Sequence, residues 1–166
     1  MKENSYHLAY HLFKSLRNSI SQTQLIDYGL PQPISFSKRK ILLFSIKLAE
    51  YLRKNCHSLR VGIVLPPGMG GTVANLAVLF SGKIPVNLNF SLGSSIAQKL
   101  IKKAEIETLI TAEKMIEKFP EFPWTDHTIE ISSWFKKLAK APYKLLIEAF
   151  LLSIPIKFSR YFLKIP

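Results

Sequence analysis

Between residues 60 and 111, short apolar runs alternate with segments of helical periodicity, and this alternation constrains the fold most strongly. Continuous apolar runs of this length, rich in β-branched residues, are typical of buried strands in a parallel sheet. The order strand, helix, strand, helix, strand predicts an α/β fold with right-handed βαβ crossovers. The expected strands are Arg60–Pro66, Lys83–Leu88 and Glu107–Thr111, and the expected helices are Thr72–Gly82 and one opened by Ser94 or Ser95.

Helices are also expected on the N-terminal side of this region. Apolar residues recur every four positions, which predicts a helix from Ser5 to Ile20. The prolines of Tyr28–Pro33 break that pattern, and Ile34–Phe36 reads as a short extended segment. Ser37 can cap the next helix, which runs to about Asn55.

The pattern changes after Thr111, where short elements and prolines precede a helical stretch. We expect a short helix over Ala112–Phe119 and a short strand over Thr128–Ile131. Ser132 or Ser133 can cap a helix over Trp134–Lys140, and Pro142 suits the first turn of a helix that reaches about Ile154, where Pro155 kinks or ends it.

Composition and charge narrow the class of protein. A chain of 166 residues with 48% hydrophobic residues can bury a proper core. The single cysteine, Cys56, excludes an internal disulfide and points to a reducing compartment. No apolar run follows the first residues, so we expect no secretory signal and a cytoplasmic protein, peripheral on the inner membrane if its basic tail binds there.

The net charge of +12 favours anionic partners, and it is concentrated at the C-terminus. The last 36 residues contain 7 basic side chains and 1 acidic side chain. We therefore divide the chain into an N-terminal α/β part, residues 1–131, and a basic amphipathic helical segment, residues 132–166.

Three patterns could carry chemistry, and each has a simpler structural interpretation. The glycine-rich stretch Pro66–Thr72 could aim backbone amides at a phosphate, but Val73 stands where a dinucleotide fingerprint needs a small residue, and the Gly-Lys-Ser/Thr of a Walker A loop is absent. His7 and His11 have helical spacing but no third metal ligand, and the neighbours Cys56 and His57 lack an orienting group. The sequence assigns no catalytic, cofactor-binding or metal-binding residue.

The stretch Arg60–Phe90 resembles a known family. Its segments Leu65–Pro67, Ala74–Ala77 and Gly82–Asn89 follow the order found in the AMP-binding acyl-adenylate-forming (acyl-CoA synthetase) superfamily. Within it, the chain looks most like the ligase half of bacterial acyl-acyl carrier protein synthetase/2-acylglycerophosphoethanolamine acyltransferase. The resemblance covers roughly residues 27–160.

The resemblance implies an ATP-dependent fatty acid:carrier ligase that serves fatty-acid activation or lysophospholipid reacylation. Such enzymes join a fatty acid to AMP and pass the acyl group to a thiol carrier, using ATP and Mg²⁺. Their phosphate loop, adenine and ribose motifs and mobile C-terminal domain have no counterpart before Pro166. We therefore expect a partial parallel-sheet layer of the large domain, inactive unless a second polypeptide supplies the rest.

The basic segment suggests another function, that of a non-catalytic protein at an anionic membrane surface. It contains seven aromatic and seven cationic residues, but charges interrupt every apolar run, so it cannot span a bilayer. The alternative is that its apolar faces pack against the rest of the enzyme. Nucleic-acid binding is disfavoured because charge is its only support. The candidate membrane-surface residues are Trp134, Lys136, Lys137, Lys140, Lys144, Lys157, Arg160 and Lys164.

Overall fold

A parallel sheet of four strands forms the centre of the computed structural model, which describes residues 7–29, 32–140 and 146–166. The strands lie in the order β4 (Ile84–Asn87), β3 (Arg60–Val64), β5 (Thr108–Thr111) and β6 (His127–Glu130). All neighbours are parallel, and helices connect them in sequence. The predicted α/β fold is confirmed. The connecting helices are α3 (Met69–Phe80), α4 (Ser94–Lys103) and α5 (Glu113–Lys118).

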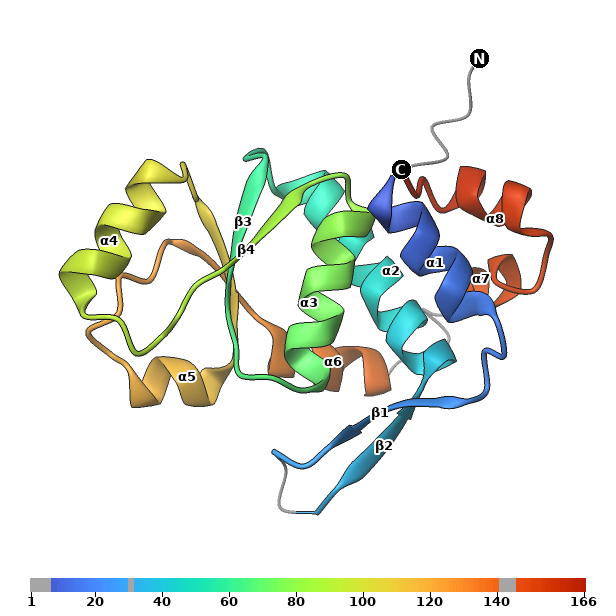
Figure 1. The fold of residues 1–166 in the computed structure, drawn as a ribbon, viewed down its shortest axis with the longest axis horizontal. Coiled ribbons are helices and arrows are strands. Elements are labelled where there is room, and N and C mark those ends of the chain that lie inside the picture. Colours follow the sequence, from blue (N-terminus) through green and yellow to red (C-terminus); the bar gives the residue numbers. More distant parts are fainter. Residues whose placement is uncertain (1–6, 30–31, 141–145) are drawn as a thin grey trace.

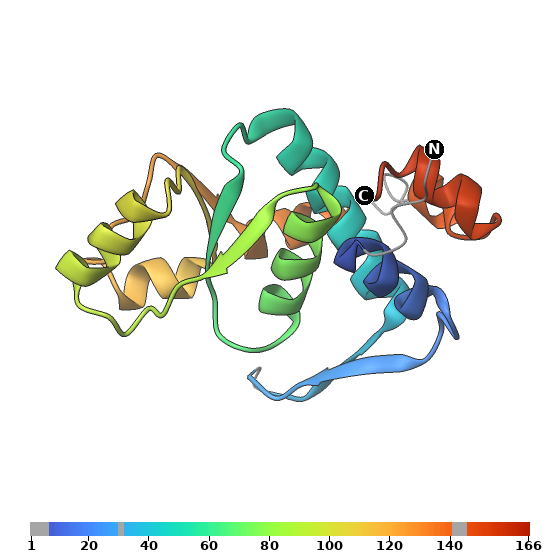
Figure 2. The ribbon, with the colours of Figure 1, turned by 45° about the horizontal axis from the view of Figure 1, so that its top comes forward.

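Helices cover both faces of this sheet, as Figure 1 and Figure 2 show. On one face, α3 packs with α1 (Leu8–Arg17) and α2 (Lys38–Asn55), and on the other lie α4 and α5. The side chains of β3 alternate between the faces, because successive strand residues point to opposite sides. Val61 and Ile63 join the larger core, and Val64 joins the smaller core under α4.

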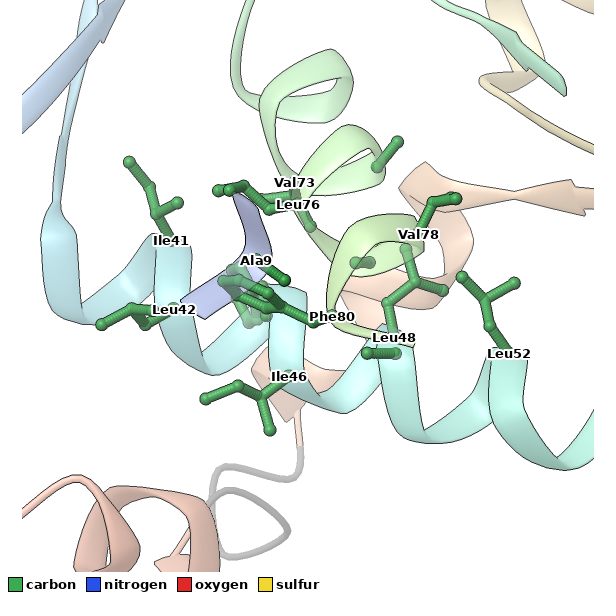
Figure 3. Close-up of a cluster of buried hydrophobic side chains, with 14 of the residues drawn as sticks. Ala9, Ile41, Leu42, Ile46, Leu48, Leu52, Val73, Leu76, Val78 and Phe80 are labelled. Carbon is green, nitrogen blue, oxygen red and sulfur yellow. The ribbon is translucent and has the colours of Figure 1, made fainter. Parts of the chain in front are cut away.

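The larger core lies between α1, α2 and α3. Figure 3 shows apolar side chains of α2 and α3 facing one another, with Ala9 of α1 beside them. Residues beyond position 131 complete this core rather than extending into solvent. They are Leu138, Leu152, Leu163 and Ile165, each at most 6% exposed.

An antiparallel hairpin, β1 (Thr23–Asp27) and β2 (Ile34–Ser37), projects away from the sheet (Figure 1). The second strand was expected over Ile34–Phe36, whereas the first was missed. Most side chains of β1 are exposed, so its sequence lacks the apolar pattern of a buried strand.

Several element boundaries differ from the sequence-based expectations. The first helix spans Leu8–Arg17, and Ser5 lies outside the described residues. The third helix begins at Met69 rather than Thr72, so Gly70 and Gly71 belong to its first turn. Gly68 makes this early start feasible, since it adopts a φ of 141°, which is strained for other residues.

The basic segment forms separate helices: α6 (Ile131–Lys140), α7 (Leu146–Leu151) and α8 (Ile156–Phe162). The expected cap at Ser132 or Ser133 is wrong, because Glu130 caps α6 instead. The helix expected to reach Ile154 ends at Leu151, and Pro142 and Lys144 lie outside the described residues. Pro155 precedes α8, where the sequence predicted a kink or an end.

Candidate functional site

The turn between β3 and α3 contains the glycine-rich stretch, and a carboxylate of the chain occupies it. Asp27 Oδ2 accepts a hydrogen bond from the Met69 amide at 2.8 Å, and Asp27 Oδ1 accepts one from Gly29 at 2.9 Å. A Cβ at Gly68 would lie 2.6 Å from Asp27 Oδ2, so the carboxylate lies directly against the turn. A phosphate here would meet a like charge and lose an amide donor. The geometry therefore favours a structural strand-to-helix turn over a nucleotide site.

Glu130 occupies the starts of two further helices in the same way. Its Oε1 accepts hydrogen bonds from the amides of Glu113 and Ser132 at 3.0 and 2.7 Å, and its Oε2 accepts one from Ser133 at 2.6 Å. Burial acts to raise the pKa of Glu130, but the hydrogen bonds from Ser133 and Ser132 outweigh it and lower the pKa to about 2. The carboxylate thus stays charged and joins α5 to α6.

These two carboxylates stand near the edge of the sheet where ligands bind in open α/β folds. The chain leaves β3 for one face and β5 for the other, which is the topological switch point that forms such crevices. Thr111 Oγ1 donates to the Val64 carbonyl oxygen at 2.8 Å and ties the two strand ends together. The helix starts following β3, β5 and β6 are therefore stabilised by the chain's own groups.

The histidine and cysteine candidates have structural surroundings. His7 caps α1, because its Nδ1 accepts a hydrogen bond from the Ala9 amide at 3.2 Å. Cys56 is buried with its Sγ 3.4 Å from Ser58 Oγ, whereas His57 is exposed. Across the described ranges, no group of three or more His, Cys, Asp or Glu side chains is placed to hold a metal ion.

The candidate membrane-surface residues fall into two groups. Trp134, Lys136, Lys137 and Lys140 belong to α6, whereas Lys157 and Arg160 belong to α8 and Lys164 follows it. In Figure 1, α6 lies near α3, and α8 lies at the end of the molecule beyond α1. Trp134 is half-buried and packs against the core beside Phe135. In the part of the chain that the structure describes, no helix is long and apolar enough to cross a membrane.

The sequence spacing of Lys137, Lys140, Lys144 and Glu148 predicts one shared helical face, and the position of Glu148 contradicts this prediction. Glu148 lies on a separate helix, α7, where it is only 5% exposed. Its Oε1 accepts a hydrogen bond from Lys47 Nζ of α2 at 2.9 Å, and Lys47 also bonds Glu50 at 2.8 Å. Sequence periodicity could not reveal an ion pair between residues 101 positions apart.

Arg17 makes a second connection to the C-terminal helices that sequence reasoning missed. Its Nη1 donates to Ser159 Oγ at 2.6 Å, and its Nη2 donates to the carbonyl oxygens of Leu152 and Ile154 at 2.8 and 2.7 Å. The guanidinium thereby binds α8 and the turn after α7 to α1. The sequence shows only that Arg17 lies in the last turn of an amphipathic helix, and this position does not predict which groups it binds.

The fold as a whole was compared with known proteins. A scan against protein-family models and a search of curated proteins found no match. Solved structures do match. A benzoate CoA ligase from Burkholderia xenovorans has a TM-score of 0.61 and 19% identity, covering 70% of this chain and 23% of its own.

A fatty acyl-adenylate ligase from L. pneumophila, in complex with acyl adenylate and pyrophosphate, has a TM-score of 0.65 and 17% identity, covering 78% of this chain and 24% of its own. The chain shares the fold of part of these adenylate-forming ligases. The N-terminal subdomain of Klebsiella oxytoca NpsA matches similarly, with a TM-score of 0.59 and 17% identity over 75% of this chain and 30% of its own. This chain spans about a quarter of the length of the two ligases.

Proposed function

We propose that the chain is the N-terminal α/β part of an ATP-dependent ligase that activates fatty acids as acyl-adenylates. The observation that carries the proposal is the parallel sheet with its helices, which matches a fatty acyl-adenylate ligase with a TM-score of 0.65. The sequence resemblance of Arg60–Phe90 supports the same assignment, because these residues form β3 and β4 of that sheet and the helix α3 between them. An acyl carrier protein or CoA would accept the acyl group, in fatty-acid activation or lysophospholipid reacylation.

In this proposal the chain's role is structural. Asp27 and Glu130 already hold amides at the starts of α3, α5 and α6, which are the donors best placed at the carboxyl edge of the sheet. Transition-state stabilisation in adenylate formation needs positioned donors and cations around the phosphates. The rest of such a ligase, beyond the part that this chain spans, would supply that machinery and complete the site.

ATP–pyrophosphate exchange tests the proposal. We would measure exchange with palmitate for the purified chain, for the polypeptide encoded directly downstream, and for their mixture. We expect fatty acid-dependent exchange only in the mixture. Exchange by the chain alone would refute its purely structural role, and a mixture that stays inactive with a range of fatty acids would refute the ligase assignment.

A second candidate function is binding to a membrane surface without catalysis. It is favoured by the large apolar side chains that α7 and α8 expose, each at least 58% accessible. Monomeric soluble proteins rarely leave extended apolar surface uncovered. These side chains are Leu146, Ile147, Phe150, Phe158, Tyr161 and Phe162.

A further inference from the structure

Two sides of α8 differ in character. Ser159 and Leu163 are buried against the rest of the molecule, and Arg17 holds Ser159 in place. A second side exposes Phe158, Tyr161 and Phe162, with Tyr161 78% accessible. Since these aromatic residues are three and four positions apart, they lie along one stripe of the helix. The helix is thus fixed on one side and presents aromatic rings to solvent on another.

Cations line a hollow beside this aromatic stripe. Lys157, Arg160, Tyr161, Lys164 and Ile165 form its walls, and both lysines are exposed. Arg160 is held in position, because its Nε donates to the Ile165 carbonyl oxygen at 3.2 Å and its guanidinium lies 4.5 Å from the centre of the Tyr10 ring. A cation held in this way loses less conformational entropy on binding an anion than a free side chain does.

The C-terminal region, residues 131–166, is almost entirely positive in charge. Glu148 is the single acidic residue in the sequence from position 131 to 166, and it is buried on Lys47. Among the residues that the structure describes, none with a carboxylate side chain lines the hollow. A second copy of the chain would bring like charges together, since each carries +12, which argues against self-association through this surface.

We propose that the hollow formed by Lys157, Arg160 and Lys164 binds the phosphate of an anionic phospholipid headgroup, while the aromatic stripe of α8 enters the lipid interface. A phosphate group can accept hydrogen bonds from all three cations, and its negative charge is attracted to their positive charges. Aromatic rings with a polar edge, such as Tyr161, prefer the boundary between headgroups and acyl chains. This inference rests on the second candidate function and assigns it to α8 rather than to the lysines of α6.

Vesicle flotation tests the inference. The full chain would be mixed with vesicles of phosphatidylcholine alone or of phosphatidylcholine with phosphatidylglycerol. We expect binding to the anionic vesicles only. Loss of two interfacial cations in the double variant Lys157→Gln/Lys164→Gln should lower the partition coefficient by about 30-fold. Phe158→Ser/Phe162→Ser should also weaken binding, because it removes the apolar contribution.

The matched control is Lys136→Gln/Lys137→Gln, which removes the same charge from exposed positions of α6. Circular dichroism would show that each variant folds. Equal losses in the two lysine pairs would overturn the α8 site but leave membrane binding intact. Failure of the wild-type chain to bind either vesicle would overturn the membrane function itself. Competition by inorganic phosphate or by double-stranded DNA at constant ionic strength, as strong as that by anionic vesicles, would also overturn a lipid-specific site.

Discussion

Individual polar side chains cap the starts of several helices in this protein. Ser37 was predictable as a cap because it directly precedes a periodic run, and its Oγ accepts a hydrogen bond from the Lys40 amide at 3.3 Å. Glu130 has the same role for α6, but the serines after it were the more obvious candidates. Asp27 could not be predicted, because the amide it caps lies 42 residues further along the chain. Local caps are therefore readable from sequence, whereas caps made by tertiary contact are not.

Glu130→Gln should destabilise the protein by about 1 kcal/mol near neutral pH, because the neutral amide caps α5 and α6 less well than a carboxylate. The pKa of Glu130 is lowered from 4.5 to about 2, so its contribution is present above pH 4.5 and is lost as the pH falls towards 2. Urea unfolding near neutral pH and at about pH 3 should show the difference between wild type and variant becoming smaller in acid. Glu121→Gln, at an exposed loop position, is the control, and a difference that stays constant with pH would contradict the expectation.

At the level of elements, the four strands of the parallel sheet were predictable, whereas β1 of the separate hairpin was not. β3, β4 and β5 lie within the expected ranges. In β3 and β5 nearly every residue is buried, which favours continuous apolar residues. β1 pairs with β2 through backbone hydrogen bonds and buries little apolar surface, so its composition does not indicate a strand.

Gly62 lies in the middle of β3, where close packing explains why this residue is a glycine. It makes room for side chains of the smaller core, since a Cβ there would lie 2.5 Å from Leu109 Cδ2 and 3.1 Å from Ile106 Cγ2.

Gly62→Ala should therefore lower the free energy of unfolding by about 1 to 3 kcal/mol through overpacking. Gly70→Ala is the matched control, because a Cβ at that position would have its nearest neighbour at 3.8 Å and the residue lies inside α3. We expect this control to be neutral or to stabilise the protein by up to about 1 kcal/mol. Urea denaturation of both variants measures the contrast, and similar losses in the two would show that β3 is less tightly packed than described.

Across the whole molecule, the C-terminal helices are joined to the N-terminal ones by charged groups. Arg17 reaches from α1 to α8, and Lys47 reaches from α2 to Glu148 of α7. Leu152 and Leu163 are buried in this chain's own core, so these two apolar residues of the tail do not need another polypeptide to cover them. Helical periodicity identified the amphipathic character of this segment, but it could not decide which residues face inward, since that depends on partners more than 100 positions away.

Arg17→Gln should release this attachment selectively. The variant loses charge-assisted bonds to Ser159, Leu152 and Ile154, so amide hydrogen exchange over residues 152–163 should accelerate by about tenfold or more. Exchange in β3 and β5 should change little. Lys14→Gln, an exposed neighbour on α1, serves as the control. Equal acceleration throughout the protein would instead indicate global destabilisation.

The turn after β3 has its own anion, because the Asp27 carboxylate accepts a hydrogen bond from the Met69 amide there. This carboxylate is tethered to the turn through the folded hairpin, so it competes with dissolved anions as an intramolecular ligand. A competing anion would have to displace this internal ligand and separate the hairpin from the start of α3. Gly68, in the stretch that resembles a phosphate-binding loop in the sequence, thus leaves room for the carboxylate of the protein's own Asp27.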